Sequence, residues 1–374
     1  MRFSRRVQTR LLMVLAMSGP ASACTLETPR IEHPLPDSLA SALHPNLASD
    51  VRDAPLWVNP ETGPDSLIAT FGARETPEAG LIGRIAMAKV RGDEIFVLDE
   101  QLNVVHLLNI PARSHVRVGR PGQGPGDLTF PRALALAEDR IYVADERQNI
   151  HVFARMDGQW SWMRDIPVPF FPMDICFMDD GLYLLALSDE ASGFIHRLEQ
   201  DDVVASFGIS YSWDNPLIRY ATTEGRLACL PEIGGIAWVP TRLNEVHMYG
   251  TDGALRWITR LPGHWPMGIV ENAESGSVAM GLTPGRSEMH MLYAVAPVAS
   301  HFLVQLSLYD QEAVDADAPK AIHSYVIDPA SGAVGEIDFP YAGLIDWHGG
   351  RMALFANDPW PKVDVIAVSE RSAK

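Results

Sequence analysis

Two stretches of the chain, Gly72 to Leu107 and Gly119 to Phe153, repeat one order of glycine-rich loop, apolar run and polar turn. Asp99 in the first stretch recurs as Asp145 in the second, 46 positions later. Short apolar runs that alternate with polar turns predict an antiparallel meander. An internal period in the forties, with several short strands per unit, is typical of a β-propeller, in which each repeat forms one blade.

The strand and turn pattern continues to the end of the chain and predicts six units. The last unit supplies only three strands, the last of them at 363–368, whereas an early strand at 66–71 belongs to no unit. Pairing these two strands would close the ring and remove its exposed edges. Six units leave about 50 residues each, whereas seven would leave no room for insertions at 208–224 and 262–288. We therefore expect an all-β, six-bladed propeller over residues 66–374, with four-stranded antiparallel blades and the last blade closed by an N-terminal strand.

The segment GRPGQGPGDLTFPRALAL, with RIYVADERQNIHVF after it, resembles the NHL repeat. That repeat has a glycine-rich loop, a proline, a strand and then the motif V-x-D-x-x-N before further apolar positions. The likeness covers two units, from Gly72 to Phe153. It implies a six-bladed propeller with NHL-like repeats, of the bacterial exported or lipoprotein type. The loop itself, Gly119 to Pro131, is too rich in glycine and proline to predict regular structure.

Residues 1–23 have the features of a signal peptide: four arginines, an apolar run at 11–17 and an Ala-Ser-Ala cleavage site. Cys24 follows at once and supports two interpretations. It is either the lipidated first residue of a bacterial lipoprotein or an accidental mature N-terminus, and lipidation is favoured because secreted chains seldom expose a lone thiol. Residues 24–65 are rich in Pro, Ser and Asp and predict a tether or strap. We expect a periplasmic or outer-membrane-anchored protein.

The charge of the chain restricts its partners. Its formal net charge is −17, and it becomes −21 without residues 1–23, which hold four arginines and no acidic residue. Such a surface repels phosphate backbones and anionic lipids, so we expect no nucleic-acid partner and no membrane contact beyond a lipid anchor. We expect a monomer that binds a protein, peptide or glycan.

Two cysteines remain inside the predicted propeller, Cys176 and Cys229, both in apolar strand-like runs. The favoured interpretation is a pair of buried thiols, with a disulfide as the alternative. No Cys/His cluster has the spacing of a zinc site.

The loops on the face of the propeller that holds the channel mouth form a candidate ligand face. Its members are polar or aromatic: Asp99, Glu100, Asp145, Glu146, Arg120, Trp213, His264, Trp265, Asn357 and Asp358. Carboxylates there could hold calcium or a substrate, since hard cations take several oxygen ligands. The favoured interpretation is turn chemistry, because Asp hydrogen-bonds its own backbone at hairpin ends and the Asp-Glu pair recurs from unit to unit. We expect no cofactor, with calcium as the one candidate.

The same repeat predicts on which strands several arginines and histidines lie. Arg84 and Arg132 begin equivalent inner strands, and we expect them to brace neighbouring blades through carboxylates. Third strands carry His106, His151, His196, His247 and His323, which radial blades would keep from converging on one metal.

The leading functional hypothesis is therefore a binding module of the cell envelope and not an enzyme. The alternative, from the resemblance to six-bladed propeller enzymes, is a calcium-dependent lactonase or arylesterase, or an NHL-type amidating lyase, with its site at the channel mouth. A third hypothesis is a scaffold subunit of a larger envelope assembly. No catalytic residue stands out: the chain has no serine nucleophile elbow, phosphate-binding loop or dinucleotide fingerprint.

Overall fold

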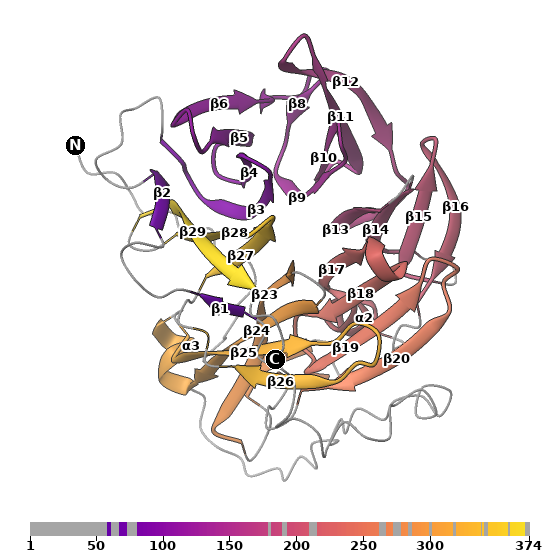
Figure 1. The fold of residues 1–374 in the computed structure, drawn as a ribbon. Helices are drawn as coiled ribbons and strands as arrows, with labels where there is room; N and C mark the ends of the chain where they lie inside the picture. Colours follow the sequence, from indigo (N-terminus) through magenta and orange to yellow (C-terminus); the bar gives the residue numbers. More distant parts are fainter. Residues whose placement is uncertain are drawn as a thin grey trace, which may run out of the picture.

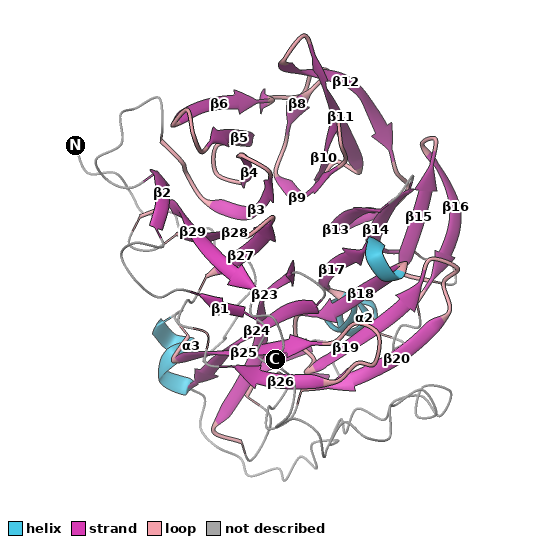
Figure 2. Ribbon diagram, viewed as in Figure 1, coloured by secondary structure: helices cyan, strands magenta, loops and turns pink. Residues whose placement is uncertain are grey.

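A computed structural model describes residues 58–60, 67–72, 81–178, 181–188, 193–208, 215–261, 267–271, 278–282, 286–298, 301–316, 319–337, 339, 343–357 and 360–370. Over these residues the strands form six four-stranded antiparallel blades around a central channel (Figure 1). Only short helices interrupt them (Figure 2). The predicted fold class and blade number are confirmed.

Each blade runs from an inner strand at the channel to an outer strand at the rim. Blade one is β3 (Ile85–Arg91), β4 (Glu94–Asp99), β5 (Val104–Asn109) and β6 (Ser114–Val118). Blade two is β9 (Pro131–Leu136), β10 (Arg140–Asp145), β11 (Asn149–Met156) and β12 (Gln159–Pro167). Blade three is β13 (Phe171–Met178), β14 (Gly181–Leu187), β15 (Ile195–Glu199) and β16 (Asp202–Phe207).

The second half of the ring follows the same plan. Blade four is β17 (Gly225–Leu230), β18 (Gly235–Pro240), β19 (Glu245–Gly250) and β20 (Leu255–Arg260). Blade five is β23 (Glu288–Val298), β24 (His301–Asp310), β25 (Ala321–Ile327) and β26 (Val334–Ile337). Blade six is β27 (Leu344–His348), β28 (Arg351–Ala356), β29 (Lys362–Glu370) and β2 (Leu67–Gly72).

The ring closes as the sequence predicted. Strand β2 pairs antiparallel with β29, with Phe71 opposite Val363 and Leu67 opposite Ile366. The inner strands then contact one another in cyclic order, β3 to β9, β13, β17, β23, β27 and back to β3. A short strand, β1 (Val58–Pro60), extends the same edge by pairing with the end of β29. It falls within the predicted tether, where no strand was expected.

Burial explains why the middle strands are almost entirely apolar. Residues Ile95 to Leu98 of β4 are all fully buried, because each blade is covered on both faces by its neighbours. Six apolar clusters each join two adjacent blades and together form the core of the described ring. The outer strand of blade three faces solvent: Asp202 to Ala205 of β16 are exposed. The outer hairpin of blade two has an Asp-Gly turn, with Asp157 (φ 50°) and Gly158 (φ 78°) in the left-handed conformation.

The inserted segments hold structure that the sequence did not predict. The 208–224 insertion contains helix α2 (Pro216–Thr223), capped by the Asn215 side chain, which accepts from the Leu217 N–H at 2.9 Å. The 262–288 insertion contains the hairpin β21 (Gly268–Glu271) and β22 (Val278–Gly281), and helix α3 (Gln311–Ala316) occupies the acidic loop of blade five. The glycine-rich loop after blade one contains a two-residue parallel pair, β7 (Arg120–Pro121) and β8 (Asp127–Leu128). No helix of the described residues is long and apolar enough to cross a bilayer.

The expectation of two buried thiols is wrong. Cys176 on β13 and Cys229 on β17 form a disulfide with a Cα–Cα distance of 5.7 Å. The two strands are the inner strands of adjacent blades, so ring packing places cysteines 53 positions apart in the sequence side by side. The bond joins blades three and four at the channel wall.

Candidate functional site

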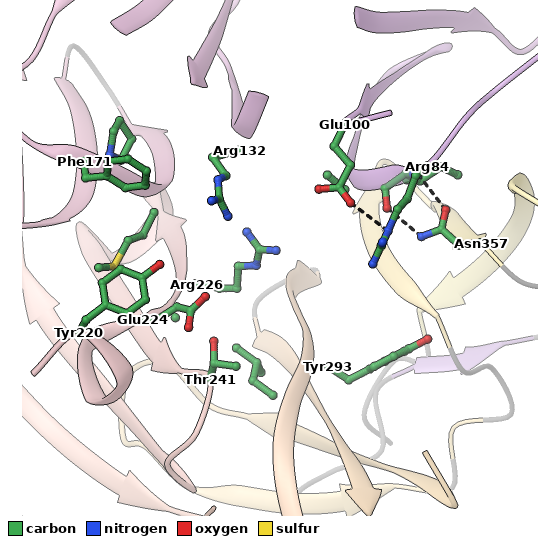
Figure 3. A pocket seen from close by; sticks show the side chains of 16 residues that line it. Arg84, Glu100, Arg132, Phe171, Tyr220, Glu224, Arg226, Thr241, Tyr293 and Asn357 are labelled. Atoms are coloured by element: carbon green, nitrogen blue, oxygen red, sulfur yellow. Dashed lines mark hydrogen bonds and ion pairs between the residues drawn. The ribbon is translucent and has the colours of Figure 1, made fainter. Parts of the chain in front are cut away.

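A cavity of about 330 Å³ lies at one mouth of the central channel (Figure 3). Its lining comes from all six blades and from helix α2, and its polar members are Arg84, Glu100, Arg132, Tyr220, Glu224, Arg226, Thr241, Tyr293 and Asn357. The apolar part of the cavity wall is formed by Ile85, Phe171, Met173 and Leu292. A volume of this size is within the range of small-molecule sites.

Register shifts in the inner strands build this mouth. Four of the six inner strands carry one residue more than their partner strand, and these residues are Ala86, Arg132, Met173 and Tyr293. All four line the cavity. An extra residue changes the direction of the side chains beside it, which is why such bulges gather at sites. The mouth is therefore assembled from equivalent positions of different blades.

Helix α2 and its C-cap residue add the Tyr220 and Glu224 side chains to the mouth. Its buried face, Ile218 and Ala221, packs against Val278 and Met280 of β22. The two insertions thus support each other beside the cavity. In Figure 3 the Tyr220 hydroxyl points toward Arg132. Burial raises the pKa of that hydroxyl, and the nearby Glu224 carboxylate adds to the effect, so Tyr220 is a neutral hydrogen-bond donor at physiological pH.

Ion pairs hold several of the charged groups. Arg84 Nε lies 2.9 Å from Glu100 Oε1, and Arg132 pairs with Glu146 and lies over the Phe171 ring. Both arginines pair with the loop of their own blade, so the expectation that they brace neighbouring blades is wrong. Each arginine lies at the start of an inner strand and its glutamate follows the second strand that pairs with it, so the two side chains lie at the same end of one hairpin.

Asn357 does join two blades. Its side-chain oxygen accepts from the Ile85 N–H at 2.8 Å, and its amide donates to the Ile85 carbonyl at 2.9 Å. The amide thus completes the hydrogen bonds of the first inner strand from the loop of blade six.

Asp99 and Asp145 lie in the turns and not in the cavity. Asp99 is fully buried and accepts from the backbone N–H groups of Gly83, Arg84, Gln101 and Leu102. Although burial raises its pKa, the hydrogen bonds from His106 and the backbone outweigh this effect and hold the pKa below its ordinary value. Asp145 accepts from the Arg147 and Asn149 N–H groups in the equivalent turn.

The other members of the predicted ligand face are scattered. Glu100 and Asn357 line the cavity, and Glu146 reaches it through Arg132. Arg120 lies on the loop beyond β6, where it pairs with Asp127 at 2.6 Å. Trp213, His264, Trp265, Asp358 and Cys24 lie outside the described residues.

Below the mouth, two buried aspartates join inner strands of neighbouring blades. Asp174 of β13 accepts from the Leu227 N–H of β17 at 2.7 Å, and Asp346 of β27 accepts from the Val90 N–H of β3. Burial raises the pKa of both carboxyls, because desolvation disfavours their charged form. The disulfide lines a second cavity of about 280 Å³ at the other end of the channel.

The third-strand histidines take no part in the mouth. His106, His151, His196 and His247 are buried within their own blades. No group of three or more His, Cys, Asp or Glu side chains among the described residues lies in metal-binding geometry.

The fold and this mouth define the class of the protein as a six-bladed β-propeller. No protein-family model matches the chain and no curated protein sequence does, so the likeness to NHL repeats stays a prediction from the sequence pattern. Many solved structures share the fold. One is a candidate exported protein from Bacteroides fragilis, with a TM-score of 0.51 and 9% identity over 81% of this chain and 94% of that chain. Another is U3-55K, with a TM-score of 0.52 and 11% identity over 83% of this chain and all of that one. At these identities the likeness shows the fold alone.

Proposed function

We propose that the protein is an exported binding module of the bacterial cell envelope, anchored by a lipid on Cys24, that receives its ligand in the channel-mouth cavity. One observation carries the binding role: the four extra residues of the inner strands all line one cavity. Closing the ring does not need them, because β17 and β27 run in unbroken register with their partners. We therefore infer that the register shifts shape the channel-mouth cavity.

The size of the cavity limits what enters it. About 330 Å³ accommodates a small molecule, a sugar unit or the end of a peptide, and it is too small for a folded surface. A protein or glycan ligand would thus present one terminal group to the mouth, with the surrounding loops contacting the rest.

Export is supported by the first 24 residues and by the disulfide. A bond between Cys176 and Cys229 is stable in an oxidising compartment such as the periplasm and is rare in a bacterial cytosol. Mass spectrometry of the N-terminal peptide from membranes tests the anchor. A mature chain that begins with an unmodified cysteine, found in the soluble fraction, would contradict it.

Binding is favoured over a calcium-dependent reaction by the charges at the mouth. Calcium takes six to eight oxygen ligands, often including several carboxylates. The two carboxylates that line this cavity, Glu100 and Glu224, are each paired with an arginine. The three guanidinium groups that line the cavity would repel a divalent cation. Metal analysis of the purified protein tests this alternative, since stoichiometric calcium would favour the enzyme.

A cavity-filling variant tests the binding role. Thr241→Trp places an indole in the mouth, whereas Thr251→Trp places one in an outer hairpin turn of the same blade. Saturation-transfer NMR with a mixed panel of sugars, sugar acids, small carboxylates and short peptides should show binding to the wild type and to Thr251→Trp. Binding should weaken at least tenfold in Thr241→Trp. A panel that binds all three proteins equally, or none of them, would overturn the proposal.

A further inference from the structure

Most charges at the mouth cancel in pairs that repeat from blade to blade. In blades one and two an arginine at the start of the inner strand pairs with a glutamate after the second strand, as Arg84–Glu100 and Arg132–Glu146. Blade four has the same pair with the charges exchanged: Glu224 precedes β17 and Arg242 follows β18. These three pairs leave no net charge.

Arg226 lies outside this arrangement. It is the second residue of β17 and its side chain lines the cavity with about a third of its surface exposed. Within the described residues, its closest carboxylate is Asp174, with 3.8 Å between Nη1 and Oδ1, which is beyond hydrogen-bonding distance. The Arg226 guanidinium is therefore the one cation at the described mouth that the repeated pairs do not neutralise.

Asp174 compensates this cation only in part. Its carboxyl is 2% exposed, and one of its oxygens is used by the Leu227 N–H. The other oxygen, Oδ1, is buried and has no hydrogen-bond partner among the described residues. Burial raises the pKa of this carboxyl, so the protein disfavours its charged form. The mouth thus holds a cation whose nearest carboxylate is buried and beyond hydrogen-bonding distance, in a molecule whose overall charge is strongly negative.

The groups around Arg226 suit a small organic anion. In Figure 3 the Arg226 and Arg132 guanidinium groups both point into the cavity, toward one another. The Arg132 Nε–H is buried and has no hydrogen-bond partner among the described residues. The Tyr220 and Thr241 hydroxyls lie on the same wall, and Phe171 provides an apolar surface.

We infer that the channel mouth binds a small monocarboxylate, whose carboxylate pairs with the Arg226 guanidinium and accepts from Arg132, and whose body packs on Phe171. The inference rests on the proposed binding role of the cavity and specifies its ligand class. A planar carboxylate matches the paired N–H groups of arginine. Inorganic phosphate is a poorer match, because a dianion would meet one uncompensated cation and the nearby Glu224.

Calorimetry on the mature full chain tests the inference with matched probes. The anions are benzoate, glucuronate and N-acetylglycine, the neutral counterparts are benzyl alcohol, glucose and N-acetylglycinamide, and inorganic phosphate is the competing oxyanion. We expect at least one carboxylate to bind at least tenfold more tightly than its neutral counterpart and than phosphate. Arg226→Gln should weaken that binding about tenfold to a hundredfold, because a charge-assisted hydrogen bond is lost, and Arg226→Lys should retain part of it.

Arg155→Gln is the matched control, since Arg155 forms an exposed rim pair with Glu94 on blades two and one. It should leave binding unchanged, and thermal unfolding shows whether each variant is folded. Equal binding of carboxylates and neutral counterparts, tighter binding of phosphate, or full binding by Arg226→Gln would overturn the inference. If the wild type binds neutral probes and Thr241→Trp does not, the proposed function stands although the inference fails. A wild type that binds no probe of either panel would overturn both the inference and the proposed function.

Discussion

At the scale of residues, buried histidines tie neighbouring strands together in blades two and three. In blade two, His151 lies between Asp145 at 3.0 Å and Asp165 at 2.7 Å. In blade three, His196 occupies the equivalent place between the Ala186 carbonyl at 3.0 Å and the Ser206 hydroxyl at 2.8 Å. The same backbone position therefore has a charged environment in one blade and a neutral one in the next.

These surroundings shift the two pKa values in opposite directions. Burial lowers the pKa of His151, but the hydrogen bonds and charges of Asp145 and Asp165 outweigh it and raise the pKa above its ordinary value. Burial lowers the pKa of His196, and the bond to the Ala186 carbonyl only partly opposes it. An NMR titration of the histidine rings should find His151 protonated at a pH where His196 is neutral.

The pH dependence of stability follows from the raised pKa of His151. Its stabilising effect is fully present below the unfolded pKa near 6.5 and is lost as the pH rises through the folded pKa. Asp165→Asn should therefore lower the free energy of unfolding more at pH 6 than at pH 9, by about 1 kcal/mol, because one charge-assisted bond to a partly exposed carboxylate is weakened. Asp202→Asn, an exposed acid on β16, is the control. Equal losses at both pH values would contradict the assignment.

At this scale, the sequence predicted several residues of the site but not how they lie relative to one another. It located Glu100 and Asn357 from their places after second strands, and it placed Arg84 and Arg132 at inner-strand starts. Arg226 also lies at the start of an inner strand, so the same signal could have identified it. Its importance depends on which carboxylates reach it, and this is a matter of distances between blades.

At the scale of elements, the sixth blade depends on a strand from the other end of the chain. Phe71 of β2 is buried in the cluster that joins blades six and one, and Ala69 beside it is also buried. Val116, on the outer strand of blade one, is exposed instead. The outer strand of blade six therefore contributes core contacts as well as backbone pairing.

Truncating Phe71 should weaken this closure. Phe71→Ala should lower the free energy of unfolding by about 3 kcal/mol, as expected for a phenylalanine removed from a core, and Val116→Ala should cost less than about 0.5 kcal/mol. Chemical denaturation measures both values. A loss in Phe71→Ala no larger than that of Val116→Ala would show that β2 does not close the ring in solution.

Sequence patterns do not reveal the bulges in the inner strands. The extra residues Arg132 and Tyr293 lie in strands whose apolar residues continue on either side. One added residue reverses the alternation of a strand, but inner strands next to a channel have no strict alternation to reverse. Only the pairing partner shows where the register changes.

At the scale of the whole molecule, the disulfide fixes two neighbouring blades to each other. Cys176 and Cys229 close a loop of 53 positions in the sequence, which includes three strands of blade three and helix α2. A cross-link over such a loop reduces the freedom of the unfolded chain. The bond therefore stabilises the part of the ring that carries both Tyr220 and Arg226.

Removing the bond should lower the free energy of unfolding by about 2–4 kcal/mol. The double variant Cys176→Ala/Cys229→Ala should unfold at the same temperature with and without reductant, whereas the wild type should lose stability when reductant is added. Thermal unfolding by circular dichroism measures both. A wild type that is indifferent to reductant while its thiols titrate as free would contradict the bond.

The sequence alone determined the blades: their number, their strands, their outer turns and the strand that closes the ring. Each blade is a meander of residues close in sequence, so apolar runs and turn residues record it locally. The tertiary structure decided the disulfide, the cation at Arg226 and the shape of the mouth. These features join residues of different blades, and their distances are set by the packing of six sheets around one channel, which no local pattern encodes.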